Sequence, residues 1–173
     1  MNMTWLRALL GSALLVVMGA VNAEPIGRLN TLSAIASPDG AMHWDMQTDA
    51  NVRVRISLLK SDMLRIWAGK AASRLDADNK SAPIVLPAHY AGVAHELKDA
   101  TDHYELKTDT LLLRIDKSPL RFALYRVGDA QPLWQELAPL DIGTTQTVQT
   151  LTSLPDERFF GGGARWIAAR PRR

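Results

Sequence analysis

Short runs in which apolar and polar residues alternate recur along this chain about every ten residues, and they restrict its fold more than any other feature of the sequence. The clearest run, Asn51–Lys60, places four apolar side chains on one face of an extended chain: Val52, Val54, Ile56 and Leu58. Arginine and serine side chains occupy the other face. This run predicts a β-strand with one face toward a core and one toward solvent.

Further runs of this kind predict strands at Asp62–Gly69, Ile84–Leu86, Tyr104–Thr108, Thr110–Asp116, Pro119–Val127, Pro132–Leu137 and Gln146–Leu151. Asp62–Gly69 follows the first run after a short turn, so we expect the two to pair as a hairpin. Outside the first 23 residues, no long stretch has the 3.6-residue apolar spacing of a helix. The sequence therefore predicts an all-β fold, an antiparallel β-sandwich.

Residues 1–23 have the pattern of a secretory signal peptide. Arg7 supplies the positive charge, Ala8–Met18 is the apolar stretch, and small residues precede a cleavage point between Ala23 and Glu24. The apolar stretch is short for a membrane span, although an uncleaved anchor is an alternative. The sequence contains no cysteine, so neither a lipid anchor on cysteine nor a disulfide is expected. We expect a periplasmic or secreted protein that leaves the membrane after cleavage.

The charge distribution argues against nucleic acid as a partner. The net charge of +2 includes five arginines that lie in residues 1–23 and 164–173, where there is no acidic residue, so the part between carries a net charge of −3. Nucleic-acid binding requires basic residues clustered on the folded domain. In residues 24–40, Ser37–Gly40 (SPDG) predicts a turn, and we expect this region to be a linker or surface segment. The sandwich is expected over 41–163, and 164–173 is a basic tail.

Three segments carry a resemblance to a known family: Leu64–Gly69 (LRIWAG), Ser118–Arg126 (SPLRFALYR) and Glu157–Gly163 (ERFFGGG). The region Met42–Gly163 resembles the N-terminal region of glycoside hydrolase family 31, the α-glucosidase and α-xylosidase group. The resemblance implies a sandwich similar in fold to galactose mutarotase, followed by a catalytic (β/α)₈ barrel. None of the three segments is a catalytic motif.

The family's catalytic carboxylates lie in the barrel, which is absent from this sequence. After the three glycines the chain reads Ala164-Arg165-Trp166, where relatives have a Gln-Asn-Gly-like segment. These features indicate a fragment truncated before the barrel, or a frameshifted reading frame, whose natural partner is the missing barrel. If a barrel were supplied, the resemblance implies retaining hydrolysis of terminal α-linked glucose or xylose.

No catalytic residue is predicted in this chain. Glycoside hydrolysis requires two carboxyl groups on either side of the scissile bond. Asp156 and Glu157 are adjacent, so in an extended segment their side chains point to opposite faces. Trp44–Gln47 (WDMQ) echoes part of the family's nucleophile motif, but we expect it to precede the first strands of the sandwich.

Candidate binding residues are Trp134, which offers a stacking face for a sugar ring or else packs in the core or at its rim, and the turn Phe159, Phe160, Gly161, Gly162 and Gly163. Glycines permit a sharp turn against a ligand or a neighbouring segment, although a tight loop at the domain edge is the alternative. Trp44 and Trp67 are expected in the core or at its rim, and Trp67 in particular is expected to pack.

No metal site or cofactor is expected. Asp76–Asn79 (DADN) lacks the central glycine and closing glutamate of a calcium loop, and the histidines lack a metal-ligand spacing. Two other functions compete with the non-catalytic domain. One is a stand-alone carbohydrate-binding module. The other is a mutarotase-like epimerase in which His95 and Glu96 would act as acid and base.

Overall fold

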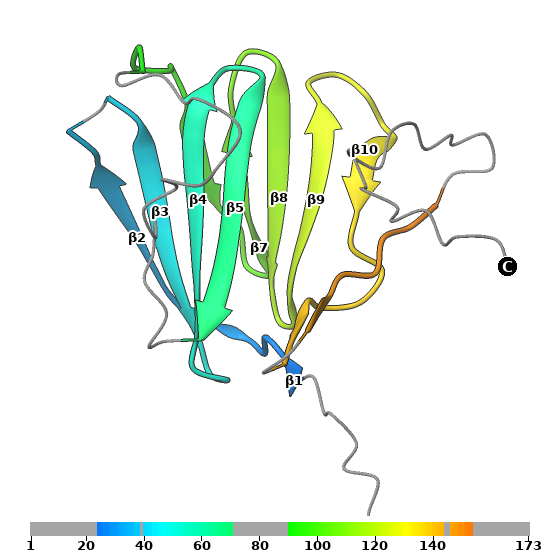
Figure 1. Ribbon diagram of the computed structural model, residues 1–173. Helices are drawn as coiled ribbons and strands as arrows, with labels where there is room; N and C mark the ends of the chain where they lie inside the picture. Colours follow the sequence, from blue (N-terminus) through cyan, green and yellow to red (C-terminus); the bar gives the residue numbers. More distant parts are fainter. Residues whose placement is uncertain (1–23, 39, 71–89, 144–145, 154–173) are drawn as a thin grey trace, which may run out of the picture.

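The part of the chain that the structure describes, residues 24–38, 40–70, 90–143 and 146–153 of a computed structural model, is an all-β protein (Figure 1). It contains no helix and consists of antiparallel strands in three sheets. Figure 1 shows the four-stranded sheet at the left and the five-stranded sheet running from behind it to the right. The predicted all-β sandwich is confirmed.

The four-stranded sheet has the order β2-β3-β4-β5. Its strands are β2 (Leu29–Ala36), β3 (Met42–Thr48), β4 (Val52–Lys60) and β5 (Met63–Lys70). The predicted hairpin is formed by β4 and β5, in which Ile56 lies opposite Ile66. The four apolar side chains at alternate positions of β4 are all buried, as the alternation predicts.

The five-stranded sheet has the order β10-β9-β8-β7-β6. Its strands are β6 (Glu96–Asp99), β7 (His103–Lys107), β8 (Leu111–Lys117), β9 (Leu120–Arg126) and β10 (Pro132–Gln135). The strands predicted at Thr110–Asp116 and Pro119–Val127 correspond to β8 and β9 within a few residues at each end. Leu113 and Ile115 of β8 face inward and are almost completely buried.

The third sheet is small and has the order β1-β11-β12 (Figure 1). Its strands are β1 (Glu24–Pro25), β11 (Asp141–Ile142) and β12 (Thr147–Val148). Directly after β1, the Ile26 N–H donates to the Leu140 carbonyl over 2.9 Å, and Gly27 accepts from the Leu120 N–H over 2.8 Å. The bond from Leu120, the first residue of β9, attaches the first described residues to the five-stranded sheet.

One hydrophobic core lies between the two large sheets, and residues of both contribute to it. Trp44 of β3 is its largest fully buried side chain, with 1% of its surface exposed. Ile26, Ile56, Leu113 and Leu120 are likewise fully buried. Burying these side chains is the main favourable contribution to folding, at about 1.5–3 kcal/mol for each large aliphatic residue.

The interpretation of residues 24–40 as a linker is wrong, because they contain β1 and β2. β2 pairs along its length with β3, and Ile26 between them is part of the core. Most side chains of β2 are exposed, since it is an edge strand, and so its sequence shows no regular alternation. The predicted turn is present: the Gly40 N–H donates to the Ser37 carbonyl over 3.0 Å.

The positions of two tryptophans differ in part from those expected. Trp44 forms part of the core, as expected, but it lies within β3 and does not precede the first strands of the sandwich. Trp67 does not pack in that core: it lies opposite Arg55, while its neighbour Ile66 faces inward. Residues directly opposite one another share a face, so Trp67 belongs to the outer face of the four-stranded sheet.

Candidate functional site

Of the predicted binding residues, the structure describes only Trp134. Phe159, Phe160 and Gly161–Gly163 lie outside the described residues, as do Ala23 of the expected cleavage point, Ile84–Leu86 and the acidic segment Asp76–Asn79. Glu24, the other residue of the cleavage point, begins β1.

Trp134 lies in β10 opposite Leu124 and faces inward, half-buried, against the edge of the core. It lines a cleft of about 370 Å³, here called the Trp134 cleft, with Asp62–Leu64, Ile66, Leu111, Leu124 and Gln149. Most of these side chains are apolar, and they come from both large sheets. The cleft therefore opens where the two sheets separate, and Asp62 and Gln149 supply its polar groups.

Glu136 follows β10 and is a buried carboxyl group beside this cleft, with 1% of its surface exposed. It accepts a hydrogen bond from the Phe122 N–H over 3.0 Å and another from the Gln149 amide over 2.9 Å. Burial raises the pKa of Glu136, while these two bonds and the Arg121 charge oppose the shift. Both carboxyl oxygens are engaged by the protein, so Glu136 holds the backbone in place.

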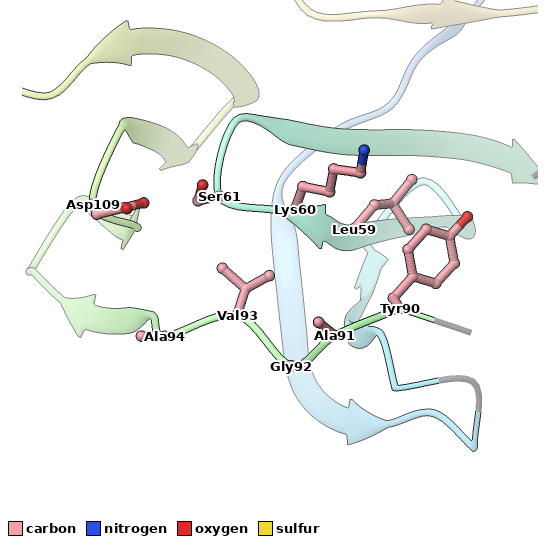
Figure 2. A pocket seen from close by; sticks show the side chains of 9 residues that line it. All are labelled: Leu59, Lys60, Ser61, Tyr90, Ala91, Gly92, Val93, Ala94 and Asp109. Atoms are coloured by element: carbon pink, nitrogen blue, oxygen red, sulfur yellow. The ribbon is translucent and has the colours of Figure 1, made fainter. Parts of the chain in front are cut away.

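The second cavity lies at one end of the sandwich and has a volume of about 610 Å³ (Figure 2). This end cavity is lined by Leu59–Ser61, Tyr90–Ala94 and Asp109. Figure 2 shows Lys60 and Tyr90 on the Leu59 side and Asp109 on the opposite side, with Val93 pointing into the space between them. The sequence analysis did not identify it, because its residues come from three separate segments.

Hydrogen bonds fix the two turns that form the rim of the end cavity. The hydroxyl groups of Thr108 and Thr110 both donate to the Ser61 carbonyl, over 2.7 and 2.5 Å. Thr108 is buried, and its hydroxyl also accepts from the Leu111 N–H over 2.9 Å. The turn between β4 and β5 is thereby attached to the turn between β7 and β8, which carries Asp109.

The outer face of the five-stranded sheet carries a network of charged side chains around His103. The His103 Nδ1 atom lies 2.6 Å from Asp102 Oδ1, and its Nε2 atom lies 3.2 Å from Glu105 Oε1. The bonds to His103 hold the pKa of both carboxyl groups below their usual values. The alternation of His103 and Glu105 in β7 is a sequence signal for a polar face, but it does not indicate the contact with Asp102.

Of the two residues proposed for an epimerase, His95 is held by the backbone and by a ring contact. His95 is exposed, and its Nδ1 atom donates to the Val93 carbonyl over 2.8 Å. Its ring is edge-on to Trp44, with the centroids 5.1 Å apart. One ring nitrogen is thus occupied by the backbone, and the ring packs over the core.

No group of three or more His, Cys, Asp or Glu side chains in the described part of the chain is arranged to hold a metal ion. Nor does the described region contain a helix long and apolar enough to cross a membrane. The cavities instead present apolar walls with a few polar side chains, which is the usual composition of a small-molecule site.

Comparison with known proteins gives a likeness in fold alone. No protein-family model and no curated protein matches the sequence. Two structures of the GH31 dextranase of Flavobacterium johnsoniae, one complexed with glucose and one a variant complexed with isomaltotriose, match with a TM-score of 0.54 and 17% identity. The match covers 67% of this chain and 13% of the dextranase.

The cycloalternan-forming enzyme of Listeria monocytogenes, in complex with a pentasaccharide substrate, matches with a TM-score of 0.47 and 16% identity, over 66% of this chain and 10% of that enzyme. The dextranase likeness confirms, at the level of the fold, the resemblance that the sequence indicates. The described part of this chain therefore has the fold of a region that makes up 13% of a family 31 glycoside hydrolase.

Proposed function

We propose that this chain provides the non-catalytic N-terminal β-sandwich domain of a family 31 glycoside hydrolase that acts on α-linked glucose or xylose. The observation that carries the proposal is the likeness of the sandwich to a partial region of the GH31 dextranase. The sequence motifs of the family agree with it. Catalysis then depends on carboxylates of a separate catalytic domain, which is the partner of this domain.

An exposed apolar surface supports the presence of such a partner. Four large side chains in or directly after β10 and β12 are exposed: Leu133, Leu137, Val148 and Leu151. They lie on neighbouring segments, because Glu136 pairs with Leu151 and the Leu137 N–H donates to the Thr150 carbonyl. Leu137 is 63% exposed, which is unfavourable for a large apolar side chain in water.

The first test is activity of the purified protein on aryl α-glucosides and α-xylosides. We expect no turnover above background, and cleavage at an enzymatic rate would overturn the proposal.

The second test is binding of a hydrophobic dye. Leu137→Ser should lower dye binding more than Ile35→Ser, a matched change at an exposed position in β2 on the other large sheet. Equal effects would argue against a partner surface beside β10.

A stand-alone carbohydrate-binding module is the second candidate, and the half-buried Trp134 in its cleft is the observation that favours it. Calorimetry with maltose, isomaltose and xyloglucan fragments separates the two proposals. Saturable heat that Trp134→Ala abolishes would favour the module. Absence of heat would favour the non-catalytic domain.

A periplasmic or secreted location remains part of the proposal, supported by the signal-peptide pattern of residues 1–23.

A further inference from the structure

We infer that the end cavity binds a neutral saccharide, at a site separate from the Trp134 cleft. The choice of a glucosyl ligand rests on the proposed function, whereas the site itself rests on the geometry in Figure 2. The volume of about 610 Å³ lies within the range of roughly 300–1,000 Å³ found for small-molecule sites.

The polar groups of the end cavity match a ligand with many hydroxyl groups. Lys60 can donate hydrogen bonds, Asp109 can accept them, and the Tyr90 hydroxyl can do both. In the described part of the chain, no hydrogen bond or ion pair engages these three side chains. The two charges are opposite and leave the site without a net charge, so it favours an uncharged ligand over an anion or a cation.

The apolar groups of the end cavity match the C–H face of a sugar ring. Leu59 is buried in the wall beside Tyr90, and Val93 projects between the two polar ends (Figure 2). Aromatic and aliphatic side chains pack against the C–H face of a pyranose, while its hydroxyl groups reach polar side chains at the edge. Short aliphatic side chains and a glycine line the segment Ala91–Ala94, which leaves room for the ring.

The rim of the cavity is held in position before any ligand binds. The hydroxyl groups of Thr108 and Thr110 attach the Ser61 carbonyl to the turn that carries Asp109. Lys60 and Asp109 are thereby kept on two turns that belong to different sheets. Positioning of this kind reduces the entropy cost of binding, since less of the site must be ordered when the ligand arrives.

The experiment is a titration of the purified, ¹⁵N-labelled protein with isomaltotriose and with maltotriose, followed by NMR. We expect saturable shifts in the amide signals of Gly92 and Val93. Asp109→Asn should weaken binding roughly tenfold, because it removes a charged hydrogen-bond acceptor. Tyr90→Leu should weaken it as well. Asp129→Asn, the same change at an exposed position in the turn after β9, should leave the affinity unchanged.

Several outcomes would overturn the inference. They are the absence of saccharide binding, an affinity that Asp109→Asn leaves unchanged, shifts confined to Trp134 and Gln149, and tighter binding of inorganic phosphate than of the saccharides. None of these outcomes contradicts the non-catalytic role, which the activity assay tests separately. Conversely, turnover of an aryl α-glucoside would overturn the proposed function whether or not the end cavity binds a sugar.

Discussion

The two large sheets share one core but have different outer edges. At the outer edge of the five-stranded sheet, β10 is followed by the buried Glu136, and residues 150–152 pair alongside residues 135–137. At the outer edge of the four-stranded sheet, β2 pairs with β3 and has no second partner among the described residues. The edge of the five-stranded sheet is thus stabilised by a buried polar group, whereas the four-stranded sheet is stabilised by the burial of apolar side chains in β3 and β4.

The largest expected loss of stability comes from a substitution in the four-stranded sheet. Trp44→Ala should lower the free energy of unfolding by about 3–5 kcal/mol, because it removes the largest fully buried side chain and leaves a cavity. Urea denaturation followed by circular dichroism measures the change. Trp67→Ala is the matched control on the outer face of the same sheet and should cost clearly less. Equal losses would mean that Trp67 contributes to the core.

The next effect concerns the edge of the five-stranded sheet. Glu136→Ala should cost about 1–3 kcal/mol, because it leaves the buried Phe122 N–H without its side-chain acceptor. Glu136→Gln keeps an acceptor oxygen for that N–H and should cost less. The same denaturation experiment compares the two variants. If the glutamine variant were as unstable as the alanine variant, loss of the hydrogen bond from the Phe122 N–H would not explain the loss of stability.

The pH dependence of stability distinguishes the edge from the outer face of the same sheet. Because burial raises the pKa of Glu136, the folded state holds its proton to higher pH than the unfolded state. Its contribution to stability is full below the ordinary glutamate pKa and is lost as the pH rises through the raised value. Asp102 and Glu105 have lowered pKa values, so their contributions are lost as the pH falls through those values.

Thermal denaturation is measured at pH values from below the ordinary glutamate pKa to above the raised pKa of Glu136. With rising pH, Glu136→Gln should therefore lose less stability than the unmodified protein. His103→Gln, which removes the imidazole ring that bonds to Asp102 and Glu105, should instead reduce the loss of stability at acid pH. Identical pH profiles for the two variants would contradict the assignment of the two trends to separate groups.

The sequence predicts the strands whose two faces differ. β4 and β8 have one buried and one polar face, so their alternation is clear. β2 exposes most of its side chains on both faces, and the same reasoning therefore took it for part of a linker. Trp67 was misplaced for a related reason: periodicity indicates a strand but does not show which face of it meets the core when both faces carry large side chains.

The candidate sites were less predictable, since they depend on contacts between distant segments. Glu136 is engaged by residues 14 and 13 positions away, and nothing in its local sequence indicates burial. The end cavity combines turns of both sheets with Tyr90–Ala94. Trp134 was identified because a tryptophan is conspicuous in any sequence, but its cleft depends on β5, β8 and β9.

The smallest effects are expected from ion pairs on the outer faces of the two sheets. On the four-stranded sheet, Arg55 makes two bonds to Asp45, of 2.6 and 2.7 Å, between side chains that are 16% and 21% exposed. On the five-stranded sheet, Lys98 lies 3.7 Å from Glu105, and the two side chains are 65% and 32% exposed.

Double-mutant cycles with alanine should give a coupling near the upper end of the range of about 0.2–1 kcal/mol for Asp45–Arg55, and near its lower end for Lys98–Glu105. Solvent screens the more exposed pair, and its longer separation weakens the attraction. Added salt should therefore reduce the second coupling more than the first. A coupling for Lys98–Glu105 as large as that for Asp45–Arg55 would mean that the five-stranded sheet depends on its outer charges as well as on its buried edge.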